Sequence, residues 1–366
     1  MRVLNNYSEC PTNLACSIRK YFGLAIKHET LKYIDEILKR KQPENVVIIL
    51  LDGMGTNIMN RTLSADSFLR SNTLKNITTV FPATTTAATT SIRTGLNPAE
   101  HGWIGWTAYL KPIDKVITLF LDSEKGHDEE LCEDFLKFKK DFTPLTITEE
   151  INRRGEFSSV EIMPFGDDAY EGLDDMINRI EHETKKPGKK HIYAYDAEPD
   201  STMHKKGPDS PEAKALIEER NAKIEKLSAK LENTLLIVTA DHGHVKVENV
   251  FLRDYPKVAN LLDRQTSIDQ RAISFKIKPG KKQEFKKEFN RNFGESYSLY
   301  DANDVFSSKL FGDGIEHELF RAMLGDYLAI ATSNKCLVAP GDEVLISQHA
   351  GYTDDEIYVP IIAKYC

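Results

Sequence analysis

Residues 46–53 read VVIILLDG, an unbroken apolar run that ends in an aspartate and a glycine. Such a run, rich in β-branched residues, is typical of a strand that is buried on both faces of a parallel sheet. Pro43 stands just before the run, and Asp52 lies at its carboxyl end. Ligands bind at the carboxyl ends of strands in open α/β sheets. The stretch therefore predicts a central strand that presents a carboxylate to a binding site.

Shorter apolar runs recur along the chain, and segments with helical periodicity separate them. This alternation predicts a doubly wound α/β fold, in which three layers form an αβα sandwich. Helical spacing within residues 13–40 predicts one or two further helices before the first strand. The expected strands are 157–163, 190–195 and 234–240, and the expected helices are 145–154, 170–184 and 209–232.

The pattern changes after Asp241, where short strands and a helix rich in lysine and glutamate replace the regular alternation. We expect a small α/β lobe at 256–338, inserted into a catalytic core that is made of residues 1–255 and 339–366. The chain shows no internal repeat. The expected strands of the lobe are 271–278, 296–300 and 326–332, and its expected helices are 280–293 and 302–310.

The composition excludes several classes of protein. The 366 residues are 40% hydrophobic and 28% charged, as in a globular protein with a sizeable core. A formal net charge of -8 offers no basic surface for a nucleic-acid duplex. No run approaches the roughly 18 apolar residues of a membrane span. The five cysteines are scattered and no apolar leader opens the chain, so we expect free thiols and a cytoplasmic protein.

Candidate chemical groups occur in short segments just beyond a strand or at the start of a helix. Taken alone, each segment has an ordinary explanation, because Asp-Gly is usually a turn and a threonine-rich stretch is usually a helix cap. Taken together, they supply three carboxylates, three imidazoles and a hydroxyl, which suffice for two zinc sites. The segments are Asp52-Gly53, Phe81-Pro82-Ala83-Thr84-Thr85-Thr86, Glu198-Pro199-Asp200 with His204, Asp241-His242-Gly243, and Gln348-His349-Ala350-Gly351-Tyr352.

The order of these segments resembles the alkaline phosphatase superfamily, and within it the nucleotide pyrophosphatase/phosphodiesterase family. The resemblance runs from about Val46 to Ala363 and implies an alkaline phosphatase-like core that holds two metal ions. In that family the nucleophilic threonine stands nine residues before the threonine of a Thr-Gly-Leu motif. Thr85 has this position relative to Thr94. The resemblance therefore assigns Thr85, among several neighbouring threonines, as the nucleophile.

The resemblance also divides the expected ligands between two divalent metal ions. One ion would activate the nucleophile, and the other would stabilise the leaving oxygen on the opposite side of phosphorus. The oxygen and nitrogen ligands suit Zn²⁺, and Mn²⁺ is the alternative. The first ion is expected to be held by Asp52, Thr85, Asp241 and His242, and the second by Asp200, His204 and His349.

Two positions depart from the family pattern. Ala88 stands where the family has an asparagine that donates a hydrogen bond to a phosphoryl oxygen. The loss of such a donor costs about 2–4 kcal/mol of transition-state stabilisation. Candidates to replace it are the backbone N–H of Thr86 and Arg93, although arginine is usually found at the surface. Met203 replaces a glycine just before His204, which changes the local shape without removing a ligand.

Two tryptophans follow the threonine-rich segment. Trp103 is expected to stack on a base or another flat leaving group, and core packing is the expected role of at least one of Trp103 and Trp106. Thr86 and Trp103 are thus the expected substrate contacts. His101 and His244 are expected to be hydrogen-bonded structural histidines, because the resemblance places no ligand at His101 and the same reasoning applies to His244.

These features predict a hydrolase of phosphoric ester or phosphoanhydride bonds. We expect a phosphodiesterase or nucleotide pyrophosphatase that acts on a small, possibly nucleotide-like phosphoester through a phospho-Thr85 intermediate, with no membrane or nucleic-acid duplex as partner. A phosphomonoesterase or phosphonate hydrolase stays open, because the donor missing at Ala88 bears on the substrate. A non-catalytic metal-binding protein is a third hypothesis, which the complete set of ligand positions disfavours. Specificity is expected to come from residues 111–145 and 256–338.

Overall fold

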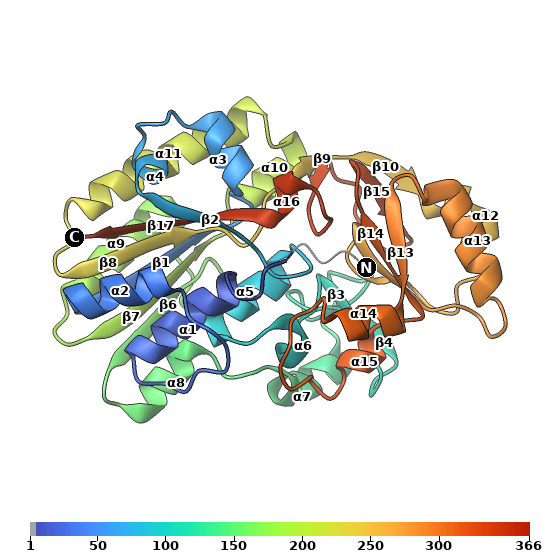
Figure 1. Ribbon diagram of the computed structural model, residues 1–366, viewed down its shortest axis with the longest axis horizontal. Helices are drawn as coiled ribbons and strands as arrows, with labels where there is room; N and C mark the ends of the chain where they lie inside the picture. Colours follow the sequence, from blue (N-terminus) through green and yellow to red (C-terminus); the bar gives the residue numbers. More distant parts are fainter. Residues whose placement is uncertain (1–4) are drawn as a thin grey trace.

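The computed structural model describes residues 5–366. Figure 1 shows two α/β parts side by side, a sheet that is covered by helices on both faces and a second sheet beside it. The chain passes between the two parts several times, because the strands in 45–78, 158–239 and 358–365 belong to the first sheet and those in 107–124 and 267–331 belong to the second. The predicted division into a catalytic core and an inserted lobe stays a prediction.

The first part is built on a six-stranded sheet with the order β2-β17-β8-β1-β7-β6. β1 (Asn45–Leu51) lies between β7 and β8 and pairs with both in parallel. β6 extends the parallel run, whereas β17 is antiparallel to β8 and β2. All four strands predicted for the core are confirmed. The other strands of this sheet are β2 (Thr73–Thr78), β6 (Ser158–Ile162), β7 (Lys190–Asp196), β8 (Thr234–Thr239) and β17 (Tyr358–Tyr365).

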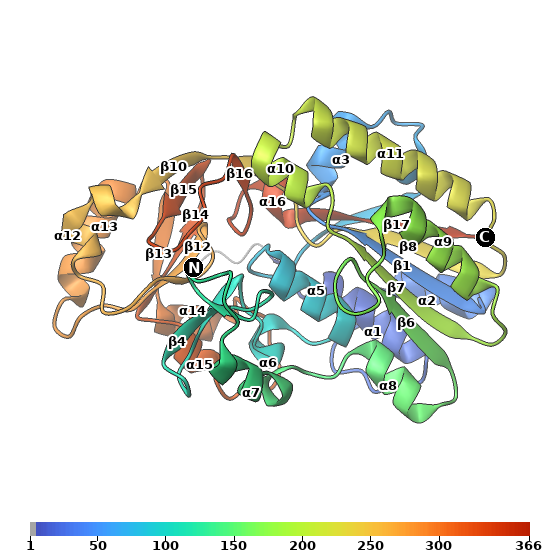
Figure 2. The ribbon, with the colours of Figure 1, turned by 180° about the vertical axis from the view of Figure 1, so that it is seen from behind.

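Helices cover both faces of this sheet, which gives the three layers of an αβα sandwich (Figure 1, Figure 2). The helices predicted at 13–40, 145–154, 170–184 and 209–232 are confirmed. One face carries α1 (Pro11–Tyr21), α2 (Lys32–Lys41), α5 (Thr85–Thr94) and α8 (Ile147–Arg154). The other face carries α3 (Thr56–Thr62), α4 (Phe68–Ser71), α9 (Gly172–Thr184), α10 (Asp200–Lys206) and α11 (Pro211–Ser228).

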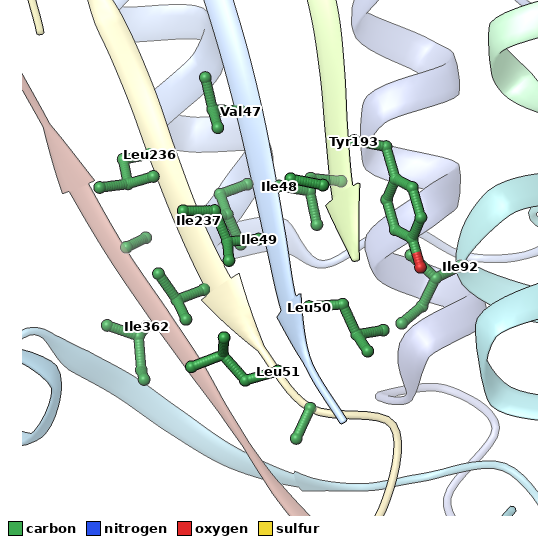
Figure 3. Packing of buried hydrophobic residues seen from close by; sticks show 14 of the residues in the cluster. Val47, Ile48, Ile49, Leu50, Leu51, Ile92, Tyr193, Leu236, Ile237 and Ile362 are labelled. Carbon is green, nitrogen blue, oxygen red and sulfur yellow. The ribbon is translucent and has the colours of Figure 1, made fainter. Parts of the chain in front are cut away.

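Apolar side chains on both faces of β1 hold the first part together (Figure 3). Ile48, Ile49 and Leu50 are fully buried, as the unbroken apolar run predicts. Ile92 belongs to the same apolar cluster and fixes α5 against the sheet. Each fully buried aliphatic side chain contributes about 1.5–3 kcal/mol relative to an exposed one. The strand that leads to Asp52 and the helix that begins at Thr85 therefore share one rigid core.

The second part contains a seven-stranded sheet with the order β13-β14-β12-β11-β3-β4-β5. Four of these strands lie within the predicted lobe, and α13 (Lys282–Phe293) and α14 (Ala302–Ser308) confirm its two predicted helices. The three other strands come from residues 107–124, outside the predicted lobe, so its boundaries at 256 and 338 stay a prediction. The strands are β3 (Thr107–Leu110), β4 (Lys115–Thr118), β5 (Ser123–Glu124), β11 (Ser267–Ile268), β12 (Ala272–Phe275), β13 (Tyr297–Asp301) and β14 (Tyr327–Ala331).

Two short ladders complete the strand pairing. β10 (Glu248–Phe251) is parallel to β15 (Lys335–Val338), and β9 (Val245–Lys246) is antiparallel to β16 (Ser347–Gln348). The second ladder brings the segment after β8 beside the segment that precedes α16 (Asp354–Ile357). The remaining short helices are α6 (Pro98–His101), α7 (Glu133–Phe142), η1 (Leu252–Asp254), α12 (Pro256–Ala259) and α15 (Phe320–Met323).

The five cysteines are free thiols, as their scattered positions predict. Within residues 5–366, the helices are all too short or too polar to cross a lipid bilayer. The cytoplasmic location stays a prediction.

Candidate active site

Three adjacent parallel strands deliver carboxylates to one edge of the central sheet. Asp52 follows β1, Asp200 opens α10 shortly after β7, and Asp241 follows β8. Because β1 lies between β7 and β8, these side chains emerge close together. Gly53 follows Asp52 with a φ of +71°, which L side chains rarely adopt, and a Cβ there would lie 3.1 Å from Asp200 Cβ. The Asp-Gly turn thus permits the close approach of β1 and α10.

Thr85 is the first residue of α5, and its side chain reaches this carboxylate edge. Its Oγ1 lies 3.1 Å from His242 Nε2 and 3.5 Å from Asp52 Oδ1. The hydroxyl of Thr84, next to it, instead donates to Asp269 Oδ2 at 2.9 Å. Among the threonines of α5, all of which the structure describes, only Thr85 lines the cavity beside the site. The structure therefore distinguishes Thr85 from its neighbours by position as well as by motif register.

The first group of candidate metal ligands surrounds Thr85. His242 Nε2 lies 3.3 Å from Asp52 Oδ1 and 3.5 Å from Asp241 Oδ2. Asp241 Oδ1 accepts hydrogen bonds from two backbone N–H groups, at 2.9 and 3.0 Å. The other oxygen, Oδ2, is therefore available as a metal ligand. Tyr195 donates its hydroxyl proton to Asp52 Oδ2 and orients that carboxylate. The structure thus brings together all four residues predicted for the first metal.

The second group joins two residues of α10 to a residue that follows β16. Asp200 Oδ2 lies 3.4 Å from His204 Nε2, one turn along the helix. The ring centroid of His349 lies 5.2 Å from that of His204. These three residues, the predicted ligands of the second metal, each offer an atom to a group whose members lie within 4.8 Å of one another. The two predicted ligand sets are adjacent, since the rings of His349 and His242 stack at 3.8 Å.

His244 belongs to the second group as well, although its sequence context suggests a structural histidine. Its Nε2 lies 2.5 Å from Asp200 Oδ1, and it is the fourth member of the group within 4.8 Å. The pairing of β9 with β16 aligns Val245 with Gln348 and so sets His244 beside His349. In the sequence, His244 is recognisable only as the second histidine of Asp-His-Gly-His. Its place in the second group depends on the long-range pairing of β9 with β16.

Three buried carboxylates meet at the site. Asp52, Asp200 and Asp241 are at most 9% exposed, and within residues 5–366 none of them forms an ion pair with lysine or arginine. Burial, and then the charges of Asp241 and Asp200, raise the pKa of Asp52 well above its usual value. Burial also opposes ionisation of Asp200, but the nearby imidazoles of His204, His244 and His349 outweigh it and lower the pKa of Asp200 well below its usual value.

These residues fit divalent metal ions. Asp241 Oδ2 is buried and has no hydrogen-bond partner among the described residues, which is costly for a carboxylate oxygen unless a cation contacts it. Burial, followed by the charge of His242, lowers the pKa of His349 well below its usual value. Its ring is therefore neutral, which is the form that binds metals. Asp200 belongs to both candidate groups, one with Asp52 and His242 and the other with the remaining histidines.

A cavity of about 280 Å³ adjoins the site and is lined by both parts of the molecule. Thr85, His204 and His349 line it from the first part, and Trp106 and Asp269 line it from the second. Concave sites with a few polar groups aimed inward are typical of small-molecule binding. The reacting groups therefore lie where the second sheet contacts the edge of the first.

The two expected substrate contacts, Trp103 and Thr86, do not line this cavity. Trp103 does not line the cavity: it is 6% exposed and its ring stacks on Phe142 at a centroid distance of 6.0 Å, inside the apolar core of the second part. Trp106, which is 37% exposed, lines the cavity in its place. The Thr86 hydroxyl is buried without a hydrogen-bond partner among the described residues and does not line the cavity, so the contact of its side chain with substrate stays a prediction.

Ala88, which replaces the asparagine of the family pattern, does not line the cavity either. Ala88 packs in a small apolar cluster with Cys10 and Val80. Arg93, a candidate replacement for the missing donor, instead pairs with Glu161 at 2.6 Å. Neither side chain therefore takes part in the site.

His101 has the structural role that its sequence context suggests. Its Nδ1 accepts the backbone N–H of Trp103 at 3.1 Å, and its Nε2 donates to Ser91 Oγ at 3.1 Å. Burial lowers the pKa of His101 to about 3, so the ring is neutral at ordinary pH. The ring ties the end of α6 to α5.

Comparisons with known proteins agree with this geometry. The family model for type I phosphodiesterase/nucleotide pyrophosphatase matches residues 46–321. Murine ectonucleotide pyrophosphatase/phosphodiesterase 5, solved as an inactive threonine-to-alanine variant in complex with AMP, has a TM-score of 0.65 at 18% identity, with 87% of each chain covered. The human protein of the same name has a TM-score of 0.64 at 19% identity, again with 87% of each chain covered. No curated protein matches the sequence of the chain.

Fold and site together define a metal-dependent hydrolase of phosphoester bonds on an alkaline phosphatase-like α/β core. The chain belongs to the type I phosphodiesterase/nucleotide pyrophosphatase family, whose model covers most of its length. The family, the fold class and the hydrolase activity predicted from the sequence are thus confirmed.

Proposed function

We propose that the chain hydrolyses a small, nucleotide-like phosphodiester or pyrophosphate, with Thr85 as nucleophile and two zinc ions as cofactors. The observation that carries this proposal is the position of Thr85 Oγ1, 3.1 Å from His242 Nε2 and 3.5 Å from Asp52 Oδ1, beside a cavity that His204 and His349 also line. A hydroxyl in this place adjoins both candidate ligand groups.

The two groups supply ligands of the kinds that zinc prefers. Bound there, the ions would lower the pKa of the nucleophile and stabilise negative charge on the attacking and leaving oxygens. Carboxylate and imidazole donors suit Zn²⁺, and Mn²⁺ is a weaker alternative where imidazoles are numerous. The proposed first set is Asp52, Thr85, Asp241 and His242, and the proposed second set includes Asp200, His204 and His349.

Thr85 also stands where a helix terminus favours an anion. It opens α5, whose first N–H groups have no side-chain cap. Such groups carry positive potential and can hold a phosphoryl oxygen. We assign the backbone N–H of Thr86 as the replacement for the donor that is missing at Ala88. In the reaction, Thr85 Oγ loses its proton to solvent and bonds to phosphorus, while the bond to the leaving oxygen breaks and that oxygen takes up a proton. Water then attacks phosphorus in phospho-Thr85, which releases the phosphorylated product and restores the Thr85 hydroxyl.

The cavity suits a leaving group with a flat aromatic portion. Trp106 is 37% exposed and lines the cavity together with Thr85, so its ring is available for stacking. Lys125 also lines the cavity, but its Nζ is already paired with Asp342 Oδ1 at 2.6 Å. The AMP bound to the murine relative supports a nucleotide as the class of substrate to test first.

The proposal is tested by comparing turnover of an aryl phosphodiester, the matching monoester and a dinucleotide pyrophosphate by one zinc-loaded preparation. We expect kcat/KM for the diester or the pyrophosphate to exceed that for the monoester. A clear preference for the monoester would contradict the proposal and favour a phosphomonoesterase. Metal analysis of the same preparation is expected to give two zinc ions per chain.

A further inference from the structure

His244 is the one imidazole of the site that the predicted ligand sets do not use. It is fully buried, and its ring centroid lies 4.6 Å from His204 and 5.2 Å from His349. Its Nε2 lies 2.5 Å from Asp200 Oδ1. A ring nitrogen of His244 is thus directed into a group of candidate metal-binding side chains, which packing alone does not require.

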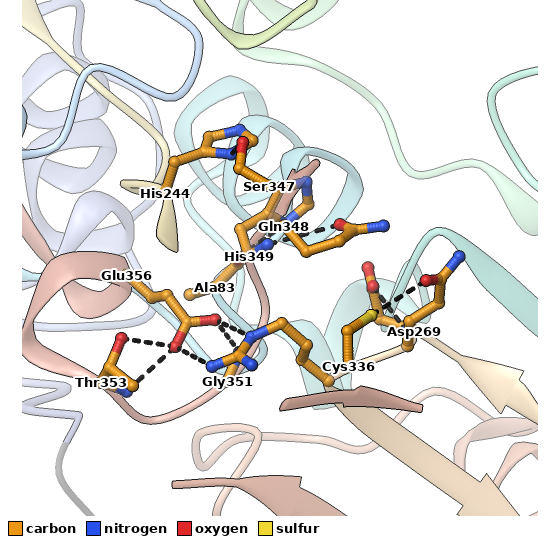
Figure 4. A network of polar contacts seen from close by, with 12 residues as sticks. Ala83, His244, Asp269, Cys336, Ser347, Gln348, His349, Gly351, Thr353 and Glu356 are labelled. Carbon is orange, nitrogen blue, oxygen red and sulfur yellow. Dashed lines mark hydrogen bonds and ion pairs between the residues drawn. The ribbon is translucent and has the colours of Figure 1, made fainter. Parts of the chain in front are cut away.

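The hydrogen bonds of Ser347 determine which nitrogen of His244 carries the proton. Ser347 Oγ has a single proton, and it donates that proton to the backbone carbonyl of Met203 at 2.6 Å. The same oxygen lies 3.0 Å from His244 Nδ1, so it must accept the N–H of that nitrogen (Figure 4). In the neutral ring, Nε2 therefore carries a lone pair, and the lone pair faces Asp200.

The two predicted imidazole ligands of the second metal are held in the same way. His204 Nδ1 lies 2.8 Å from the carbonyl of Ser347, and His349 Nδ1 lies 3.1 Å from the carbonyl of Ala83. A carbonyl only accepts, so both Nδ1 atoms carry the proton and both Nε2 atoms have a free lone pair. A hydrogen bond from the non-ligating nitrogen is the usual support of a metal-bound histidine. His244 has the same support, because its Nδ1 donates to the Ser347 hydroxyl, which the carbonyl of Met203 holds in place.

The contact between His244 Nε2 and Asp200 Oδ1 then requires a cation. Two acceptors that face each other at 2.5 Å repel unless a proton or a metal ion lies close to both. We propose that His244 Nε2 is a direct ligand of the second metal ion, which completes a set of three imidazoles and one carboxylate with His204, His349 and Asp200. This inference rests on the proposed two-metal function and refines its second site.

A set of three nitrogen donors and one oxygen donor has a chemical consequence. Imidazole favours zinc and cobalt, whereas manganese and magnesium prefer oxygen ligands. The first set, with His242 as its only imidazole, is richer in oxygen. The two sites are therefore expected to differ in metal selectivity, and the second site is expected to exclude Mn²⁺ more strongly than the first.

The test uses the full chain loaded with Co²⁺, whose visible spectrum reports the donor atoms directly and independently of activity. His244→Ala removes the nitrogen, and His244→Gln keeps most of the buried volume in case the alanine variant folds poorly. His191→Asn is the matched control, because His191 is also buried but hydrogen-bonds Ser159 outside the site. Thermal unfolding and circular dichroism identify which variants are folded.

We expect both His244 variants to change the spectrum of one bound Co²⁺ and to weaken that site by more than about 100-fold, the upper end of the effect of a residue that only supports a ligand. The control is expected to match the wild type. An unchanged Co²⁺ spectrum at saturating metal in a folded His244 variant would overturn the inference. If the wild type itself bound fewer than two ions, the proposed function would fail instead, so the two failures are distinguishable.

Discussion

Thr85 differs from the hydroxyls around it by what its oxygen contacts. Thr84 Oγ1 is engaged by Asp269, and Thr89 Oγ1 donates to the backbone carbonyl of Thr85 at 2.6 Å. Thr85 Oγ1 alone among these three contacts candidate metal ligands, Asp52 and His242. At this scale the chemistry depends on a single residue position, which the motif register predicts and the geometry supports.

Replacing Thr85 tests this assignment. We expect Thr85→Ala to lower kcat by about 10⁴-fold or more, the scale that follows deletion of an enzymatic nucleophile. Thr85→Ser is expected to retain measurable activity, because it keeps a hydroxyl at the same helix position. Thr90→Ala on the same helix serves as the control, since its side chain does not line the cavity. Steady-state hydrolysis of an aryl phosphodiester measures all three, and near-normal activity of Thr85→Ala would exclude Thr85 as the nucleophile.

Asp269 gives the cavity a titratable group outside the ligand sets. Its carboxylate accepts Thr84 Oγ1 at 2.9 Å and the backbone N–H of Gln270 at 2.7 Å, but burial still raises its pKa to about 6. A carboxyl whose folded-state pKa is raised loses its proton more readily in the unfolded chain. Ionisation of Asp269 therefore costs stability progressively between about pH 4 and pH 6, and the full cost remains above that range.

Asp269→Asn cannot ionise and removes this cost. In metal-free protein, we expect the free energy of unfolding of the variant relative to wild type to rise by up to about 3 kcal/mol between pH 4 and pH 7, because the pKa of Asp269 is raised to about 6 from an ordinary value of about 4. Urea denaturation at a series of pH values measures the difference. A difference that does not change with pH would show that Asp269 does not titrate in this range.

At the scale of elements, a buried ion pair joins the second sheet to the segment that carries His349. Arg271 lies between β11 and β12, and its guanidinium contacts both carboxylate oxygens of Glu356 in α16, at 2.6 and 2.8 Å. Both side chains are fully buried. The same carboxylate accepts the backbone N–H of Gly351 at 2.8 Å, two residues after His349. The pair thus fixes the segment that carries His349 relative to the cavity wall.

Breaking this pair is expected to be costly. Glu356→Ala leaves a buried guanidinium without its partner, which destabilises a protein by about 3–5 kcal/mol. Glu284→Ala is the control, because Glu284 pairs with Lys281 at the surface and an exposed pair contributes about 0–1 kcal/mol. Denaturant unfolding with wild-type metal content compares the variants. Equal stability of the two variants would show that the buried pair does not hold these elements.

The sequence predicts the elements of the first part better than those of the second. β1 and β8 are apolar along most of their length, β7 has an apolar and aromatic centre, and all three strands are buried on both faces, so a local pattern suffices to identify them. β3, β4 and β5 are only two to four residues long, and β3 joins the sheet through the pairing of Thr107 with Ile268. That pairing is set by tertiary contacts, which no local pattern shows.

The same distinction explains which site residues the sequence predicts. Asp52, Asp200 and Asp241 follow recognisable strands, so the fold class alone places them together. His244 joins the site only because β9 pairs with β16. The choice between Trp103 and Trp106 depends on which ring stacks on Phe142 in the core, and the two residues look alike in sequence.

At the scale of the whole molecule, the site is a buried excess of negative charge where the two sheets meet. Bound metal ions stabilise the folded state by mass action, by about 2.7 kcal/mol for each ion present at 100 times its dissociation constant. Chelation is therefore expected to abolish hydrolysis and to lower Tm by several degrees, and Zn²⁺ is expected to restore both. Calorimetry before and after dialysis against a chelator measures the shift. Full activity in metal-depleted protein would contradict a metal-dependent mechanism.

In the proposed mechanism, the phosphoryl group is transferred to Thr85 before water attacks phosphorus. The most direct test is to quench the zinc-loaded enzyme in acid within the first turnover of an aryl phosphodiester and to map the modified peptide by mass spectrometry. We predict a phosphoryl adduct that carries the retained ester group on Thr85 and that disappears as substrate is exhausted. Turnover with the adduct on another residue, or at full rate with no adduct on Thr85 at any quench time, would contradict the claim.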